Sequence, residues 1–178
     1  MILAQEARWQ LGLDRVALVP VFAPPHKEAD ADPGPEARLE LCERAVEGVE
    51  GLVVLDLEVR RAGPSFTVDT LRALHADGSG DDLTFIVGGD MALSLPTWRE
   101  PEEVLRLARL GVAERAGASR ADIQDRLAPL GGRADFFSMP RIDISSTDLR
   151  ARVSAGRPYA HLVPAGVAEC VSRKGLYR

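Results

Sequence analysis

The chain has 178 residues, of which 46% are hydrophobic and 28% charged, and its net charge at pH 7 is −5. This balance predicts one globular domain over residues 1–178. The negative charge argues against sequence-independent binding of nucleic acid, although a few basic side chains would suffice for a small anion. No apolar run reaches the roughly 20 residues of a membrane helix. We therefore expect a cytoplasmic protein that binds neither nucleic acid nor membrane, and the sequence permits a homo-oligomer.

Helical and strand periodicities alternate along the chain. In chain order they predict a helix over 2–11, a strand over 16–22, a helix over 36–46, a strand over 52–57, a helix over 67–76, a strand over 83–87, a helix over 101–108, a strand over 110–113, a helix over 119–130, a strand over 136–139, and helices over 145–155 and 164–172. This alternation favours an α/β fold, with a mostly parallel sheet covered by helices on both faces. Such sheets bind ligands beyond the carboxyl ends of their strands.

Two cysteines, Cys42 and Cys170, lie in predicted helices among apolar neighbours. Because they do not form a C-x-x-C pair, we expect two half-buried or buried thiols rather than a zinc or redox site. His75 and His161 are likewise expected to be surface or packing residues.

The first candidate motif, Pro24-Pro25-His26-Lys27, follows the first predicted strand. Two prolines stiffen this loop, so His26 and Lys27 would be presented to a phosphate at a low entropic cost. A solvated basic pair after a turn is the alternative interpretation.

The second motif joins Gly88-Gly89-Asp90 to Trp98 across the end of another predicted strand. The glycines would let the backbone approach a ligand closely. Asp90 could accept from ribose hydroxyls, and Trp98 could stack on an aromatic ring. The alternatives are a helix N-cap for Asp90 and core packing for Trp98.

The remaining motifs open predicted helices. Ser145 and Ser146 begin one, where free N–H groups favour an anion, and Arg150 could fold back toward the helix start. Thr67, in Ser-Phe-Thr, begins another. The plainer interpretations are a serine cap with a solvated Arg150, and an N-cap for Thr67.

Together, these motifs resemble the nicotinate-nucleotide adenylyltransferase family, from Met1 to the terminal Gly-Leu-Tyr-Arg. The resemblance implies a Rossmann-like nucleotidyltransferase fold. It also implies that ATP and nicotinate mononucleotide, with Mg²⁺, give deamido-NAD and pyrophosphate. We assign no metal ligand among these motifs.

The resemblance also implies residue roles. Lys27, with His26 nearby, would contact phosphate, and Thr67 would bind the nicotinate carboxylate. Trp98 would stack on the pyridine ring and Arg115 would line the mononucleotide side. Gly88 and Asp90 would lie at the adenosine, with Asp90 and His26 supporting catalysis. The ATP phosphates would be held by Ser145, Ser146 and Arg150.

Family members carry a segment similar to Gly-Gly-x-Phe-Asp-Pro-x-His-x-Gly-His before the first helix. The 178-residue sequence instead starts at Met1, within that helix and without a cap. We therefore expect a start codon assigned too far downstream and a missing first, central strand. The 178-residue chain should then be less stable and far less active than an upstream-extended version.

Three rival functions remain at this stage. The accepted substrate could be nicotinamide mononucleotide, or another phosphate such as phosphopantetheine. The chain could instead be a catalytically impaired nucleotide-binding module. A dinucleotide-binding oxidoreductase is disfavoured, because no G-x-G-x-x-G motif follows a predicted strand.

Overall fold

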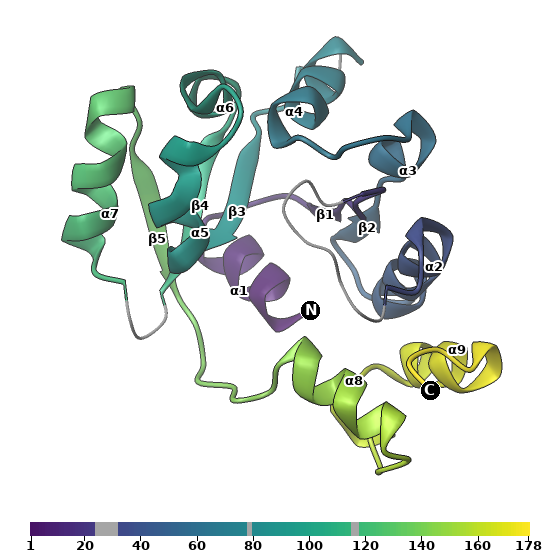
Figure 1. The fold of residues 1–178 in the computed structure, drawn as a ribbon. Helices are drawn as coiled ribbons and strands as arrows, with labels where there is room; N and C mark the ends of the chain where they lie inside the picture. The colour runs from purple at the N-terminus through teal and green to yellow at the C-terminus, as the bar shows by residue number, and fades with distance from the viewer. Residues whose placement is uncertain (24–31, 78–79, 115–117) are drawn as a thin grey trace. The chain divides into compact units, whose positions relative to one another are not determined.

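The computed structural model describes residues 1–23, 32–77, 80–114 and 118–178. The chain divides into two compact units (Figure 1). The sheet unit comprises Ile2–Val16 and Ser65–Arg141, and the helical unit comprises Met1, Ala17–Pro64 and Ile142–Arg178. Within the described ranges, no helix is long and apolar enough to cross a membrane.

The sheet unit contains three parallel strands in the order β3-β4-β5. The strands are β3 (Thr84–Gly88), β4 (Arg109–Glu114) and β5 (Ala134–Ser138). The helices are α1 (Ile2–Gln10), α4 (Thr67–Ala76), α5 (Gly89–Ser94), α6 (Pro101–Leu107) and α7 (Arg120–Leu127), with 3₁₀ turns at Leu95–Thr97 and Ala128–Leu130. The predicted parallel sheet is confirmed for these strands.

Successive residues of β4 face opposite sides of this sheet, as the strand period requires. Leu110 and Val112 join the larger core, to which α4, α5, α6 and α7 contribute buried side chains. Ala113 instead clusters with Ala7 of α1 and with Phe137. On the same side a Cβ added at Gly111 would lie 2.9 Å from Leu11 Cδ1. Helices therefore cover both faces, as predicted.

The described residues of the helical unit form a two-stranded sheet and four α-helices. The elements are β1 (Val16–Leu18, which starts at the unit boundary), β2 (Leu52–Val54), α2 (Pro35–Val46), α3 (Leu57–Arg61), α8 (Ser146–Ser154) and α9 (Ala165–Lys174), with a 3₁₀ turn at Ala160–Leu162. Arg173 and Lys174 of α9 both pair with Glu40 of α2. The hydrogen bond from Lys174 lowers the pKa of Glu40. These ion pairs link α9 to α2.

The structure corrects three of the predicted elements. The strand expected over 16–22 ends at Leu18, two residues before Pro20, which has no N–H for a ladder bond. It is not buried on both faces, because Ala17 is exposed. Residues 57–61 form α3, although we expected a strand end and loop there. Residues 89–94 form α5 instead of a loop.

Both cysteines are free thiols, with Cys170 buried and Cys42 half-buried. Burial raises the pKa of each thiol. The two thiols are therefore packing groups, as the sequence predicts.

Candidate functional site

The connection from β3 to α5 places Asp90 at the carboxyl end of a parallel strand. Val87 is buried in β3, and the strand ends at Gly88. Gly88 is the N-cap residue of α5, so the alternative that Asp90 caps this helix is wrong. Asp90 is the second residue of α5 and is exposed. Its carboxylate can therefore meet a ligand at the edge where such sheets bind them.

The two glycines before Asp90 both have close neighbours within the protein. A Cβ added at Gly88 would lie 2.8 Å from Asp90 Oδ1. One added at Gly89 would lie 2.9 Å from the Cβ of Ala118. Gly89 is thus needed for a close approach to a neighbouring side chain, whereas the sequence suggested an approach to a ligand.

Replacing Gly89 by alanine should destabilise the protein by about 1–3 kcal/mol, the usual range for overpacking. The double variant Gly89→Ala/Ala118→Gly removes the clashing methyl group and should recover most of this loss. Denaturant unfolding of the two single variants and the double variant measures the coupling. Additive effects would contradict the proposed steric contact.

Trp98 follows the 3₁₀ turn Leu95–Thr97 and is half-buried. Its indole Nε1 donates to Ser94 Oγ at 3.1 Å. Its ring meets Phe85 of β3 edge-on, with centroids 5.9 Å apart and an interplanar angle of 77°. Trp98 also packs against the larger core, which supports the core-packing alternative, and part of its surface remains accessible.

Thr67 is the first residue of α4, and Phe66 occupies the N-cap position without a side-chain cap. The alternative that Thr67 is the N-cap is therefore wrong. Val68, its neighbour, is fully buried and anchors this end of α4 in the core. Thr67 is half-buried.

The serine motif lies in the helical unit, where Ser145 is the N-cap of α8. Its Oγ accepts from the Asp148 N–H at 3.0 Å and donates to Asp148 Oδ2 at 2.6 Å. Ser145 and Ser146 are exposed. The plainer interpretation, a serine cap, is confirmed for Ser145, and anion binding at this helix start stays a prediction.

Arg150 points toward the end of the chain. Its guanidinium carbon lies 5.5 Å from the ring centroid of Tyr177, a cation–π contact. Tyr177 itself has a positive φ of 63°. Ser146, Arg150 and Tyr177 all line one cavity of about 140 Å³. Arg150 is therefore half-buried against an aromatic ring and is not fully solvated, and its approach to a phosphate at the start of α8 stays a prediction.

The two serine caps allow a matched test of Ser145. Ser119 caps α7 in the same way, with its Oγ accepting from the Asp122 N–H at 3.1 Å. Ser145→Ala and Ser119→Ala should each cost about 1 kcal/mol of stability, because each removes one cap. Only Ser145→Ala should also weaken ATP binding, measured by calorimetry. Equal ATP affinity in both variants would show that Ser145 only caps α8 and does not bind ATP.

Three predicted site residues, His26, Lys27 and Arg115, lie outside the described residues. The described candidates divide between the units: Thr67, Gly88, Asp90 and Trp98 belong to the sheet unit, and Ser145, Ser146 and Arg150 to the helical unit. Within the described ranges, no group of three or more His, Cys, Asp or Glu could hold a metal ion.

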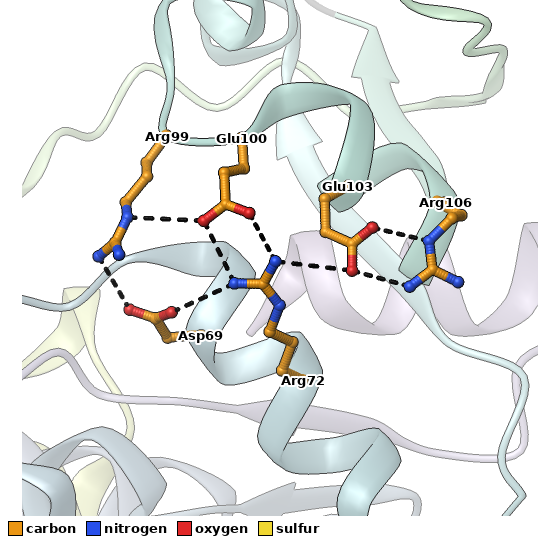
Figure 2. A network of polar contacts seen from close by, with 6 residues as sticks. All are labelled: Asp69, Arg72, Arg99, Glu100, Glu103 and Arg106. Atoms are coloured by element: carbon orange, nitrogen blue, oxygen red, sulfur yellow. Dashed lines mark hydrogen bonds and ion pairs between the residues drawn. The ribbon is translucent and has the colours of Figure 1, made fainter.

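Sequence reasoning missed a charged network on α4, α6 and the turn before α6. Figure 2 shows its members, Asp69, Arg72, Arg99, Glu100, Glu103 and Arg106. The i,i+3 spacings of Asp69 with Arg72 and of Glu103 with Arg106 were the available sequence signal. The contacts between α4 and the turn depend on tertiary structure and had no such signal.

Comparison with known proteins places the chain in a family. The cytidylyltransferase-like family model matches residues 1–152. A "Probable nicotinate-nucleotide adenylyltransferase" of Desulfitobacterium hafniense is 36% identical, over 100% of this chain and 88% of the relative. One from Roseiflexus sp. is 38% identical, over 100% of this chain and 90% of the relative.

A solved structure supports the same fold. The nicotinic acid mononucleotide adenylyltransferase of Plasmodium falciparum, complexed with NaAD, superposes with a TM-score of 0.75 at 14% identity, covering 99% of this chain and 88% of that one. At this identity the likeness concerns the fold alone. The sequence matches carry the assignment further, because they run through both units of the structure. The chain belongs to the nicotinate-nucleotide adenylyltransferase family.

Proposed function

We propose that this protein transfers the adenylyl group of ATP to nicotinate mononucleotide, giving deamido-NAD and pyrophosphate. One observation carries the proposal beyond family membership. An exposed Asp90 stands at the carboxyl end of β3, and a half-buried indole, Trp98, follows on the same connection. A carboxylate suited to hydroxyl groups and a flat apolar face are the groups that a nucleotide and a pyridine ring require.

The mononucleotide would be bound chiefly by residues that contact its pyridine ring and the carboxylate on it. Trp98 would stack on the pyridine, and the Thr67 hydroxyl would donate to the nicotinate carboxylate. Arg115 would line the same side, and Lys27 with His26 would contact phosphate. The half-buried position of Thr67 at the start of α4 supports its role, since the hydroxyl is not used as a cap.

ATP would be bound by a second group of residues. Gly88 and Asp90 would lie at the adenosine, where the carboxylate accepts from ribose hydroxyls. Ser145, Ser146 and Arg150 would hold the phosphates. The start of α8 supports this assignment, because Ser145 and Ser146 are exposed at the N-terminus of this helix, where free N–H groups favour an anion.

The reaction is an in-line displacement. An oxygen of the mononucleotide phosphate attacks the α-phosphorus of ATP, the bond to the bridging oxygen of the β-phosphate breaks, and pyrophosphate leaves with the electron pair. The nucleophile is already an anion, so the protein needs to position it and to stabilise charge. Mg²⁺ would enter bound to ATP and neutralise charge on the phosphates. It usually keeps several waters and needs few protein ligands, and among the described carboxylates Asp90 lies at the proposed ATP position.

The choice between acid and amide substrates tests the proposed contact of Thr67 with the nicotinate carboxylate. The Thr67 hydroxyl should favour nicotinate mononucleotide over nicotinamide mononucleotide, because a charged acceptor forms the stronger hydrogen bond. Turnover of each substrate with saturating ATP measures the preference. Faster turnover of the amide would show that the chain is an adenylyltransferase of the other pyridine mononucleotide.

A further inference from the structure

Arg99, the residue after Trp98, contacts the beginning of α4. Its Nη1 lies 3.3 Å from Asp69 Oδ2, and its guanidinium carbon lies 4.8 Å from the ring centroid of Phe66. Phe66 immediately precedes Thr67, and Asp69 follows it by two residues. Through these two contacts Arg99 holds the chain that carries Trp98 against the chain that carries Thr67.

A second contact reinforces the first. Arg72 of α4 binds Glu100 with both terminal nitrogens, at 3.2 Å and 2.5 Å. Arg72 Nη1 also lies 3.8 Å from Asp69 Oδ1, and Arg99 Nε lies 3.7 Å from Glu100 Oε1. Asp69, Arg72, Glu100 and Arg99 therefore form a closed ring of alternating charges, which Figure 2 shows at the top of α4. Such a ring is geometrically more specific than an isolated surface ion pair.

The backbone at Glu100, a member of this ring, has an uncommon conformation. Glu100 has φ 51° and ψ 59°, a left-handed conformation that residues other than glycine rarely adopt. It also precedes Pro101, which restricts its backbone further. Such a conformation persists where the surroundings fix it. The hydrogen bond from Arg72 lowers the pKa of Glu100, so its carboxylate stays ionised and paired.

The other end of α6 is held on α4 as well. His75 Nε2 lies 2.7 Å from the carbonyl oxygen of Leu107. The charged ring therefore acts on a helix pair that is joined at both ends. Within this pair, the ring adds polar contacts between the chain leaving Trp98 and the start of α4, beside the packing of Trp98 and Phe66 against the core.

We propose that Arg99 is a positioning residue for the pyridine mononucleotide, which fixes the separation between the Trp98 indole and the Thr67 hydroxyl. The inference rests on the proposed function, in which these two groups bind the pyridine ring and its carboxylate. Stacking and a hydrogen bond to one rigid ligand can form together only when the two protein groups are held at the matching distance. Arg99 itself need not touch the ligand.

The test compares Arg99→Ala with Arg106→Ala. Arg106 belongs to the same network and binds Glu103 with two nitrogens, both at 2.7 Å, but both residues lie in α6. Arg99→Ala should raise the Kd for nicotinate mononucleotide about tenfold, equivalent to about 1.4 kcal/mol. It should leave the Kd for ATP unchanged, and Arg106→Ala should change neither. Calorimetry measures each affinity without requiring turnover.

Two further measurements separate positioning from general stability. Arg99→Lys keeps the charge beside Asp69 and should recover part of the affinity. In a Trp9→Phe background, where Trp98 is the remaining tryptophan, Arg99→Ala should shift the emission of Trp98 and Arg106→Ala should not.

The outcomes are distinguishable. Unchanged mononucleotide affinity in Arg99→Ala would overturn this inference and leave the proposed function intact. An equal loss of ATP affinity would also overturn it, because the effect would then be general. A parent chain that binds no nicotinate mononucleotide would contradict the proposed function itself, and the inference with it.

Discussion

Replacing Asp90 by asparagine is expected to lower the rate of deamido-NAD formation about a hundredfold, within the usual range for one preorganised group in an active site. The substitution keeps the side chain's shape and removes its charge. A carboxylate can accept from two ribose hydroxyls, whereas an asparagine amide replaces one acceptor by a donor. The exposed place of Asp90 after β3 means that the loss should appear in the rate and not in the stability.

The matched control for Asp90 is Asp125→Asn, which removes the charge of another exposed aspartate, within α7. Both variants should unfold within about 0.5 kcal/mol of the parent, as surface substitutions usually do. The rate of product formation, relative to the parent chain, should fall for Asp90→Asn alone. A rate within threefold of the parent would remove Asp90 from the proposed catalytic residues.

Replacing Trp98 by leucine is expected to raise the Kd for nicotinate mononucleotide about 10- to 100-fold, because stacking of an aromatic ring on a side chain is worth about 1–3 kcal/mol. Leucine can still fill apolar space beside Phe85, which meets the indole edge-on. It offers no flat face to the ligand. Trp98→Phe restores such a face and should recover most of the affinity, measured by calorimetry.

Trp9 provides the control for this second prediction. It is the other tryptophan of the chain and is 86% exposed on α1. Trp9→Leu should leave the mononucleotide affinity unchanged. If Trp98→Leu binds the mononucleotide as tightly as Trp98→Phe, the indole is a packing group, and other residues bind the pyridine ring.

Local sequence rules predicted the parts of the fold that depend on local interactions. Ser119 and Ser145 each precede an aspartate by three residues, and both cap their helices as that spacing indicates. The period of apolar residues predicted α4 over Thr67–Ala76 with the bounds that the structure has. The alternation of strands and helices predicted the parallel pairing of β3, β4 and β5.

The failures occurred where tertiary contacts or single residues outweigh pattern. The apolar run after Val16 resembles a long buried strand, yet β1 ends before Pro20. Gly88-Gly89 at the end of a predicted strand suggested a loop, yet Gly89 begins α5 and lies close to Ala118, a contact that the local sequence does not indicate. Thr67 looked like a cap, but the preceding Phe66 takes that position.

In the candidate site, too, local sequence patterns predicted some residues, and others depend on tertiary contacts. Asp90, Trp98, Thr67 and Ser145 were all found from motif residues at predicted strand ends or helix starts. Arg99 was not, because its partners Phe66 and Asp69 lie about thirty positions away in sequence. No local pattern connects such residues, and the contact follows only from the packing of α4 beside α6.

The most direct test of the central claim is the identity of the product. The 178-residue chain is incubated with ATP, Mg²⁺ and nicotinate mononucleotide, and the products are separated and identified by mass spectrometry. We expect deamido-NAD and pyrophosphate in equal amounts, however slow the turnover. ATP that binds in calorimetry but yields no dinucleotide would contradict this function and identify the protein as a nucleotide-binding module.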